Sequence, residues 1–331
     1  MRYLNFIATN DIHWQLSNPR SRKDSYPEAL KKKLLEISDL ARKHEASGVL
    51  IAGDIVNSPG IGLVAIAELG GLFLSFPCPI YAIAGQHDEW DHTPTSLPRT
   101  PFGILSRLGI IRDVAKNPKI LKVEGTDTDV TITGRHYDYR VDNDPDYYMS
   151  DYSYPAFNIH LAHGMILDHS PGFEMKHTLV SQVKTNANIL HVGDYHPGIG
   201  IKKYVANGKG RAIVNLGALA RKEASAGELE RQVQVALIRV YENKSFDIDA
   251  IPLQSALPGH TVLSREHLEA EASRNEMLER FLALLSSEGE SKFLEVREII
   301  EDIALREAIP AEVKADALRR IGAAREELGV G

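Results

Sequence analysis

The 331-residue sequence is poor in cysteine and in long apolar runs. A single cysteine, Cys78, cannot form an internal disulfide, and its apolar setting predicts a buried, inert thiol. No run approaches the roughly 18 apolar residues that a membrane span needs. The first residues also lack the basic head and small-residue cleavage site of a signal peptide. We therefore expect a cytoplasmic protein without membrane association.

Positive charge is not in excess either, because 38 Lys and Arg face 45 Asp and Glu. The acidic surplus lies mostly in residues 261–331, which hold ten basic and sixteen acidic residues. An acidic balance does not exclude a nucleic-acid substrate, since bound divalent metal ions would supply local positive charge. The thirteen histidines are more than this composition leads us to expect, and we interpret some of them as metal ligands.

The segment 48–58, GVLIAGDIVNS, is typical of a buried parallel strand that ends at a carboxylate, Asp54. Alternating strands and helices over residues 3–84 predict right-handed crossovers, which place the carboxyl ends of the strands on one edge. Five short polar segments, each directly after a predicted strand, would meet there: Asp11-Ile12-His13, Gly53-Asp54, Gly85-Gln86-His87-Asp88, His163-Gly164 and Gly193-Asp194-Tyr195-His196.

Carboxylates and imidazoles gathered in this way suit the hydrolysis of a phosphate ester. Two divalent ions roughly 3.5–4 Å apart can lower the pKa of a bound water and neutralise the phosphoryl oxygens. A carboxylate that bridges the ions would hold them this close, with histidine and oxygen ligands in the remaining positions.

In order and spacing, the five segments resemble the calcineurin-like metallophosphoesterases, whose pattern is DxH, GD, GNH(D/E), H and GHxH. The resemblance implies a four-layer α/β/β/α sandwich over residues 1–258 and a helical C-terminal region over residues 259–331. It also implies two divalent metal ions, manganese or alternatively magnesium. The ligands of the first ion would be Asp11, His13, Asp54 and His196. Those of the second would be Asp54, Gln86, His163 and Asp194.

Two further residues of the pattern carry catalytic roles by resemblance. His87 matches the position that protonates the leaving oxygen or stabilises the transition state, and Asp88 would orient its ring. Gln86 and Asp194 stand where the family has asparagine and histidine. Asp194 is a harder ligand than histidine and favours manganese or magnesium over zinc; the alternative is a degraded site with one metal.

A basic stretch precedes the first predicted helix, which begins near Pro27. Arg20, Arg22 and Lys23 are interpreted as a phosphate-contacting edge, with a solvated surface as the alternative. His92, close to a matched loop, is a further candidate for substrate contact. We assign all four as substrate-binding residues.

Strands of a second sheet are predicted at 121–125, 129–139, 156–164 and 187–198, and three antiparallel strands at 212–221, 233–241 and 245–253 would close it. From about Ser264 two apolar stripes indicate helices, one from Leu268 to Leu285 and one from Phe293 to Ile303. These helices would either pack on the sandwich or dock on a partner.

The opening strand and the segment 213–240 resemble the nuclease subunit of DNA double-strand-break repair complexes. This implies a DNA exonuclease or endonuclease in repair or recombination, with DNA and an SMC-like coiled-coil ATPase subunit as partners; a homodimer is left open. The alternatives are a phosphodiesterase or phosphatase acting on nucleotides or cyclic nucleotides, and a non-catalytic metal-binding scaffold.

Overall fold

The computed structural model describes residues 1–144, 146–152, 156–266, 299–301, 303–305 and 309–327. It divides the chain into two compact units, Met1–Ser264 and Arg265–Gly331. None of the described helices has the length and apolar character to cross a membrane. The metal-ligand candidates all belong to the first unit, which is therefore the one that bears on function.

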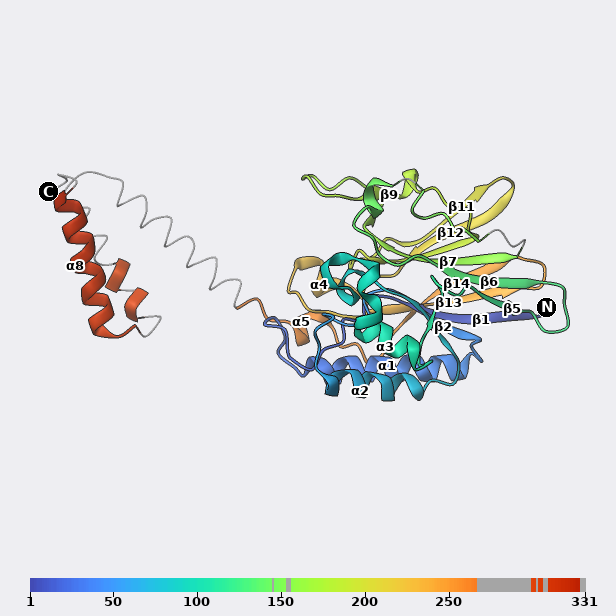
Figure 1. Cartoon of the computed structure of the whole chain (residues 1–331), viewed down its shortest axis with the longest axis horizontal. Coiled ribbons are helices and arrows are strands. Elements are labelled where there is room, and N and C mark those ends of the chain that lie inside the picture. Colours follow the sequence, from blue (N-terminus) through green and yellow to red (C-terminus); the bar gives the residue numbers. More distant parts are fainter. Residues whose placement is uncertain (145, 153–155, 267–298, 302, 306–308, 328–331) are drawn as a thin grey trace. The chain divides into compact units, whose positions relative to one another are not determined.

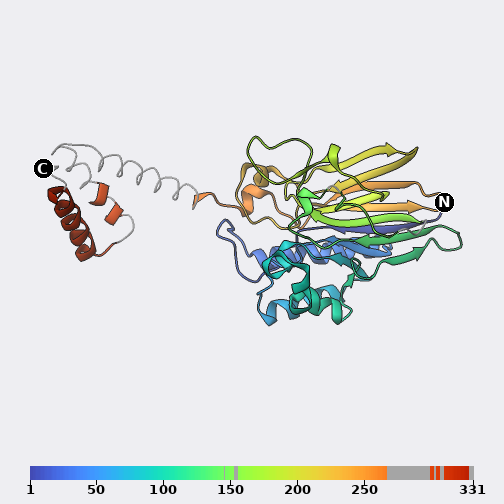
Figure 2. The same ribbon diagram turned by 45° about the horizontal axis from the view of Figure 1, so that its top comes forward.

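The first unit is built on two mixed six-stranded sheets (Figures 1 and 2). The first sheet runs in the order β14 (Phe246–Pro252), β13 (Gln234–Tyr241), β1 (Tyr3–Thr9), β2 (Gly48–Ala52), β3 (Ile80–Ile83) and β4 (Arg112–Asp113). The second runs in the order β11 (Gly200–Ala206), β12 (Lys209–Asn215), β10 (Ile189–Asp194), β7 (Phe157–Gly164), β6 (Asp129–Gly134) and β5 (Lys119–Lys122). The α/β sandwich architecture predicted from the sequence is confirmed.

The two sheets pack face to face because their strands alternate side chains between two cores. Phe6 and Leu50 point between the sheets, where they meet Phe157, while their neighbours Ile7 and Ile51 face the other way. That outer face is covered by α1 (Tyr26–Lys43) and α2 (Leu63–Leu74), which lie side by side in Figure 1, and by α3 (Pro101–Arg107).

The outer face of the second sheet is covered by the described residues of two segments, 135–152 and 165–183, which flank β7 in the sequence (Figure 1). They form short 3₁₀ turns at Val141–Asn143 and Val180–Gln182 and the small sheet of β8 (Ile166–Leu167) and β9 (Thr178–Leu179). The Tyr147 and Tyr148 side chains are buried there. This face of the sheet is therefore covered largely by loops with buried tyrosines and not by long helices.

The prediction that the strands near residues 233–253 close the second sheet is wrong. β13 pairs antiparallel with β1 in the first sheet, with Ile238 opposite Phe6, and β14 lies outside it. Ile238 faces the core between the sheets, and Leu237 faces the helix side. Strands buried on both faces carry apolar patterns that do not reveal which sheet they join.

The remaining described helices are short, apart from the last. α4 (Ala226–Glu230) and α5 (Gly259–Val262) pack together through Ala224, Val262 and Leu263. α8 (Ala311–Glu327) belongs to the second unit. Residues 267–298, which hold most of the two predicted apolar stripes, lie outside the described residues. The role predicted for the region beyond residue 258 stays a prediction.

Candidate metal centre

The loops after β1 and β2 continue the parallel pairing of their strands, and this places their polar residues together. The Asp11 amide donates to Gly53 O (3.1 Å) and the His13 amide to Asp54 O (2.9 Å). All three polar side chains are fully buried. Backbone hydrogen bonds thus hold together two loops that are distant in sequence.

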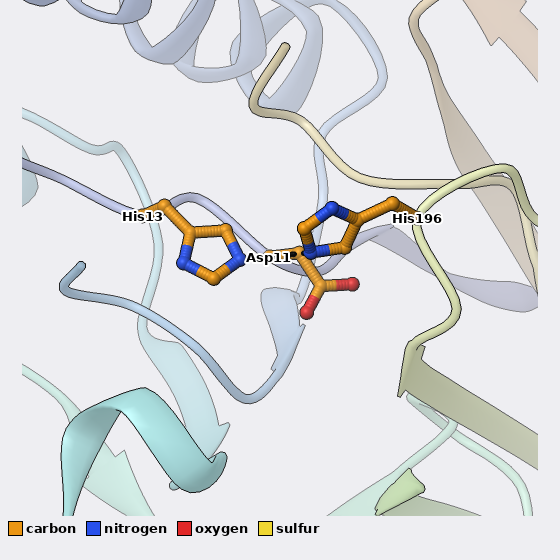
Figure 3. A group of neighbouring side chains, drawn as sticks. All are labelled: Asp11, His13 and His196. Carbon is orange, nitrogen blue, oxygen red and sulfur yellow. Dashed lines mark hydrogen bonds between the residues drawn. The ribbon is translucent and has the colours of Figure 1, made fainter. Parts of the chain in front are cut away.

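The first group of candidate ligands joins these two loops to the loop after β10. Asp11, His13 and His196 offer ligand atoms that lie within 4.8 Å of one another. Figure 3 shows the His13 and His196 rings turned toward each other, with the Asp11 carboxylate beside them. Their Nε2 atoms are 3.0 Å apart. Two imidazoles and a carboxylate form a suitable donor set for a divalent transition metal.

Asp54 joins this group to a second one. Its Oδ2 lies 3.6 Å from His13 Nε2, 3.5 Å from His163 Nε2 and 4.0 Å from His87 Nε2. Asp11, Asp54 and His163 form a further group of ligand atoms within 4.8 Å. The His and Asp clusters, with Asp54 between them, are consistent with a dinuclear metal site.

The atoms at the centre of these clusters are left without hydrogen bonds by the protein. Asp54 Oδ2, His163 Nε2 and Gln86 Oε1 are buried and have no hydrogen-bond partner within the described part of the chain. His163 Nδ1 lies 2.7 Å from Ala52 O, and because a carbonyl only accepts, Nδ1 carries the proton. In the neutral form of the ring, which a metal ligand requires, the lone pair of Nε2 faces Asp54, so the residues present fit a pair of divalent cations.

Gln86 and Asp194 contact each other directly. Gln86 Nε2 donates to Asp194 Oδ1 over 2.6 Å, which leaves the amide oxygen free to bind a metal. The Asp194 amide in turn donates to both oxygens of Asp11 (3.2 and 3.1 Å). In the clusters of the described residues Asp11 accompanies Asp54 and His163, and the role of Asp194 as a second-site ligand stays a prediction.

Several of these ligands sit on strained backbone. Asp11, His13, Asp54 and Asp194 have φ values of 50°, 48°, 52° and 96°, in the left-handed region that non-glycine residues rarely adopt. Such strain, of order 1–3 kcal/mol per residue, is typical of functional sites where the surrounding fold fixes the geometry. A Cβ on Gly85 would overlap Asp54 Oδ1, so this turn requires glycine.

The buried charges shift one another's pKa values. Burial raises the pKa of Asp11 to about 7, and repulsion from Asp54 adds to the rise. Burial also opposes ionisation of Asp54, but the imidazoles of His163 and His13 outweigh it and lower the pKa of that carboxyl. Burial lowers the pKa of His196 to about 4, so its imidazole is neutral at neutral pH, the form that binds metal.

His87 lies at the edge of the centre with its side chain 40% exposed. Its Nδ1 donates to Asn57 O over 2.8 Å, which directs Nε2 toward Asp54. Asp88, expected to orient this ring, instead accepts from the amides of Ile55, Val56 and Gly85. That expectation is corrected: Asp88 ties two loops together because it is buried beneath them, and Asn57 orients the ring.

Lys222 is a site residue that the sequence reasoning missed. Its Nζ donates to Asn57 Oδ1 over 2.8 Å, so Asn57 holds both His87 and a cation. The charge of Lys222 contributes, after burial, to the lowered pKa values of His196 and His13. A basic residue directly after the segment 212–221 was the available signal, but only the fold places its ammonium group against Asn57.

The four residues predicted to contact substrate differ in their exposure. Arg22 is buried and paired with Asp24, so the prediction that it contacts substrate phosphate is corrected. Arg20 and Lys23 are exposed. His92 is also exposed, and its ring lies 6.1 Å from that of Tyr137, which in turn lies 6.2 Å from His163.

Comparison with known proteins gives one family match. Residues 4–197 match the model of the calcineurin-like phosphoesterase family, which covers more than half of the chain. No curated protein matches the sequence. Among solved structures, GAP50, described as the anchor in the inner membrane complex of Plasmodium, shares 11% identity over 76% of this chain and 85% of its own, with a TM-score of 0.44. Another crystal structure shares 10% identity over 75% of this chain and 99% of its own, with a TM-score of 0.42.

Proposed function

Because the chain belongs to the calcineurin-like phosphoesterases, we propose that its metal centre hydrolyses the phosphodiester bonds of DNA. Metal-dependent phosphoesterase activity follows from the family and from the clusters around Asp54. The observation that carries the proposal toward a large substrate is the contrast in exposure at the site. Asp54 and His163 are fully buried, whereas His87 beside them is 40% exposed.

Bound divalent ions would activate the attacking water and neutralise charge on the phosphoryl oxygens. The chain itself supplies the proton. With Nδ1 of His87 fixed by Asn57 O, a protonated ring presents its second proton at Nε2. As the phosphorus–oxygen bond to the leaving group breaks, Nε2 gives this proton to the leaving oxygen, and the oxygen of water takes its place on phosphorus. Lys222 offers an ammonium group to a phosphate oxygen.

Further observations support DNA over a small phosphodiester. Arg20 and Lys23 are exposed basic residues just before α1, and cations of this kind contact phosphates along a nucleic-acid backbone. The segment 213–240 resembles its counterpart in the repair nucleases. We extend the proposal to an SMC-like coiled-coil ATPase subunit as a partner; self-association into a homodimer stays a prediction.

The test is an activity panel with manganese on the full-length chain: linear duplex DNA, single-stranded DNA, cyclic nucleotides and bis(p-nitrophenyl) phosphate. The Asp54→Asn variant is the matched control, because it removes the shared carboxylate charge with little change in shape. We expect the wild type to cleave DNA and the variant to be inactive on every substrate. Turnover of cyclic nucleotides without DNA cleavage would replace DNA as the substrate, and no metal-stimulated turnover would favour a scaffold.

A further inference from the structure

Apart from the metal centre, the first unit has a cavity of about 340 Å³ between α1 and the segment 255–262. Its volume is within the range of small-ligand sites. None of the predicted metal ligands lines it. Four cationic and two acidic side chains do: Arg22, Lys32, Lys33, Arg221, Asp24 and Glu28. The charge of the wall is therefore positive.

Lys33 is a buried cation of this wall without a paired carboxylate among the described residues. The residue is 3% exposed, and its Nζ donates to Leu219 O over 2.7 Å. An ammonium group carries three protons, and within the described ranges no carboxylate oxygen lies within 4.0 Å of this one. Burial, followed by the charge of Arg22, lowers the pKa of Lys33 well below its usual value. An unpaired buried cation of this kind is costly.

Arg221 is the second buried cation of the wall, and it shares its nearest carboxylate, that of Glu228, with Arg231. Its Nη1 donates to Leu257 O (2.7 Å) and its Nη2 to Arg231 O, while Nε has no hydrogen bond to any described residue. Glu228 comes no closer than 3.9 Å to that Nε. Glu228 is instead held by Arg231, whose guanidinium donates to both of its oxygens over 2.7 and 2.9 Å.

The other charges of the wall cancel. Arg22 donates to both oxygens of Asp24 over 2.7 Å, a bidentate pair. Lys32 and Glu28 are exposed residues of opposite charge. What remains is a surplus of two positive charges on Lys33 and Arg221 when the Lys33 amine is protonated, the form that a bound anion would favour. Ser255 Oγ, a buried hydroxyl without a hydrogen-bond partner among the described residues, lines the same cavity.

We propose that this cavity binds a phosphate dianion, either free inorganic phosphate or the phosphate group of a small phosphomonoester. A dianion matches the surplus of two charges on Lys33 and Arg221. Its oxygens accept the hydrogen bonds that the Lys33 ammonium leaves open, and Arg221 and Ser255 line the same cavity. The site is separate from the metal centre and independent of the substrate proposed above.

Binding in this cavity would also affect the metal loops through one short segment. Lys33 and Arg22 donate to the carbonyl oxygens of Leu219 and Arg221, and the Leu219 amide donates to Asn10 O over 3.0 Å. The next amide, that of Ala220, donates to Asp11 O over 3.0 Å. An anion that fixes Lys33 and Arg221 therefore stiffens the backbone that supports the ligand Asp11.

The test is the thermal unfolding of full-length, chelator-treated protein in inorganic phosphate and, separately, in ribose 5-phosphate. Lys33→Met keeps the length of the side chain and removes its charge; Lys31→Met is the matched control, because Lys31 is an exposed lysine on the same helix. We expect phosphate to raise the unfolding temperature of the wild type and of Lys31→Met. Lys33→Met should bind phosphate about ten- to hundredfold more weakly, the worth of a charged hydrogen bond.

A second variant covers the case in which Lys33→Met does not fold. Ala29 lines the cavity, so Ala29→Glu would place a carboxylate inside it and abolish the response to phosphate. A response to both ligands identifies a phosphomonoester site, and a response to inorganic phosphate alone identifies a site for the free ion. Equal responses from Lys33→Met and Lys31→Met, or no response from the wild type at millimolar phosphate, would overturn the proposal.

Discussion

Gln86 donates a 2.6 Å hydrogen bond to Asp194, so the two positions at which this chain departs from its family's ligand pattern contact each other. The amide of glutamine is one methylene further from the backbone than that of asparagine. That length lets its nitrogen reach a carboxylate while its oxygen has no hydrogen-bond partner among the residues that the structure describes. The two departures are therefore coupled, and together they keep an amide oxygen and a carboxylate at the site.

This coupling predicts the outcome of a double-mutant cycle. Gln86→Asn and Asp194→His each break the contact, and each should weaken manganese binding about ten- to hundredfold, the worth of a charged hydrogen bond. The double variant restores the family pattern and should recover most of the loss. Calorimetric titration with manganese measures all four proteins. Losses that simply add in the double variant would show that the two residues act independently.

The clusters around Asp54 predict two metal ions. Crystals soaked in manganese should give two anomalous peaks roughly 3.5–4 Å apart, with Asp54 between them. Asp54→Asn is the control, and it should lose at least one peak because the shared carboxylate is gone. A single peak in the wild type that contacts neither Gln86 nor Asp194 would mean that the second site is lost.

His87 is predicted to act in the chemical step. Replacement by alanine should lower turnover of bis(p-nitrophenyl) phosphate by about 10²–10⁴ with manganese occupancy unchanged, because a positioned acid typically contributes this much. Occupancy is measured by elemental analysis of the same samples. Loss of metal in proportion to activity would assign His87 to metal binding instead.

Lys222→Met is the matched comparison for His87→Ala, since both side chains are held by Asn57. It removes the ammonium charge that is proposed to contact a phosphate oxygen, and it leaves the hydrogen bond of the His87 ring to Asn57 in place. We expect a smaller decline in turnover than for His87→Ala, with partial recovery in Lys222→Arg. A loss that arginine does not recover would argue against a role for the charge.

The parts of this fold that the sequence predicts are those with local signals. The strand that leads to Asp54, the helix Tyr26–Lys43, the loop with Asp11 and the end of β7 with His163 each carry an apolar run or a short polar motif. Parallel strands bring such loops to one edge, so the candidate ligands could be predicted together. The local sequence does not reveal which sheet β13 joins, because both faces of this strand are apolar and would pack equally well in either sheet.

The missed features depend on contacts between residues that are distant in sequence. The Lys222 side chain reaches Asn57, 165 positions earlier, and nothing near either residue signals the pairing. Asp88 follows His87 directly, which suggested a ring partner, yet its carboxylate turns toward the amides of Ile55 and Val56. Arg22 lies in a basic stretch that predicts a phosphate-contacting edge. Its side chain is instead buried and paired with Asp24.

His160 predicts how stability depends on pH. His160 lies on β7, and its buried side chain contacts Thr133 of the neighbouring strand β6. Burial lowers the pKa of His160 to about 3. The unfolded chain therefore binds a proton below about pH 6.5 that the folded chain does not, so the stabilising contribution is lost progressively as the pH falls from 6.5 toward 3. Between pH 6.5 and 5 the loss from this residue should be about 2 kcal/mol.

Urea unfolding of the wild type and of His160→Asn at these two pH values measures the effect. Asparagine keeps a polar group beside Thr133 and does not titrate, so the variant should lose about 2 kcal/mol less over the same interval. The comparison uses the difference between the two pH values, and a lower overall stability of the variant does not affect it. An equal pH dependence in both proteins would show that another group governs acid unfolding.

The last prediction concerns the second unit, Arg265–Gly331. Leu263 and Ser264 pair with Arg22 and Ser21, so a truncation that preserves the first unit must end after Ser264. We expect this truncated chain to bind manganese and to hydrolyse bis(p-nitrophenyl) phosphate like the full-length protein, because all candidate ligands precede that point. It should fail to associate with a coiled-coil ATPase subunit, since an acidic region whose sequence predicts amphipathic helices suits a helix-in-groove contact with protein better than a contact with DNA. Pull-down with the ATPase and circular dichroism measure the two properties separately. If the truncated chain unfolds, the C-terminal helices belong to the core of the first unit, and the docking proposal should be abandoned.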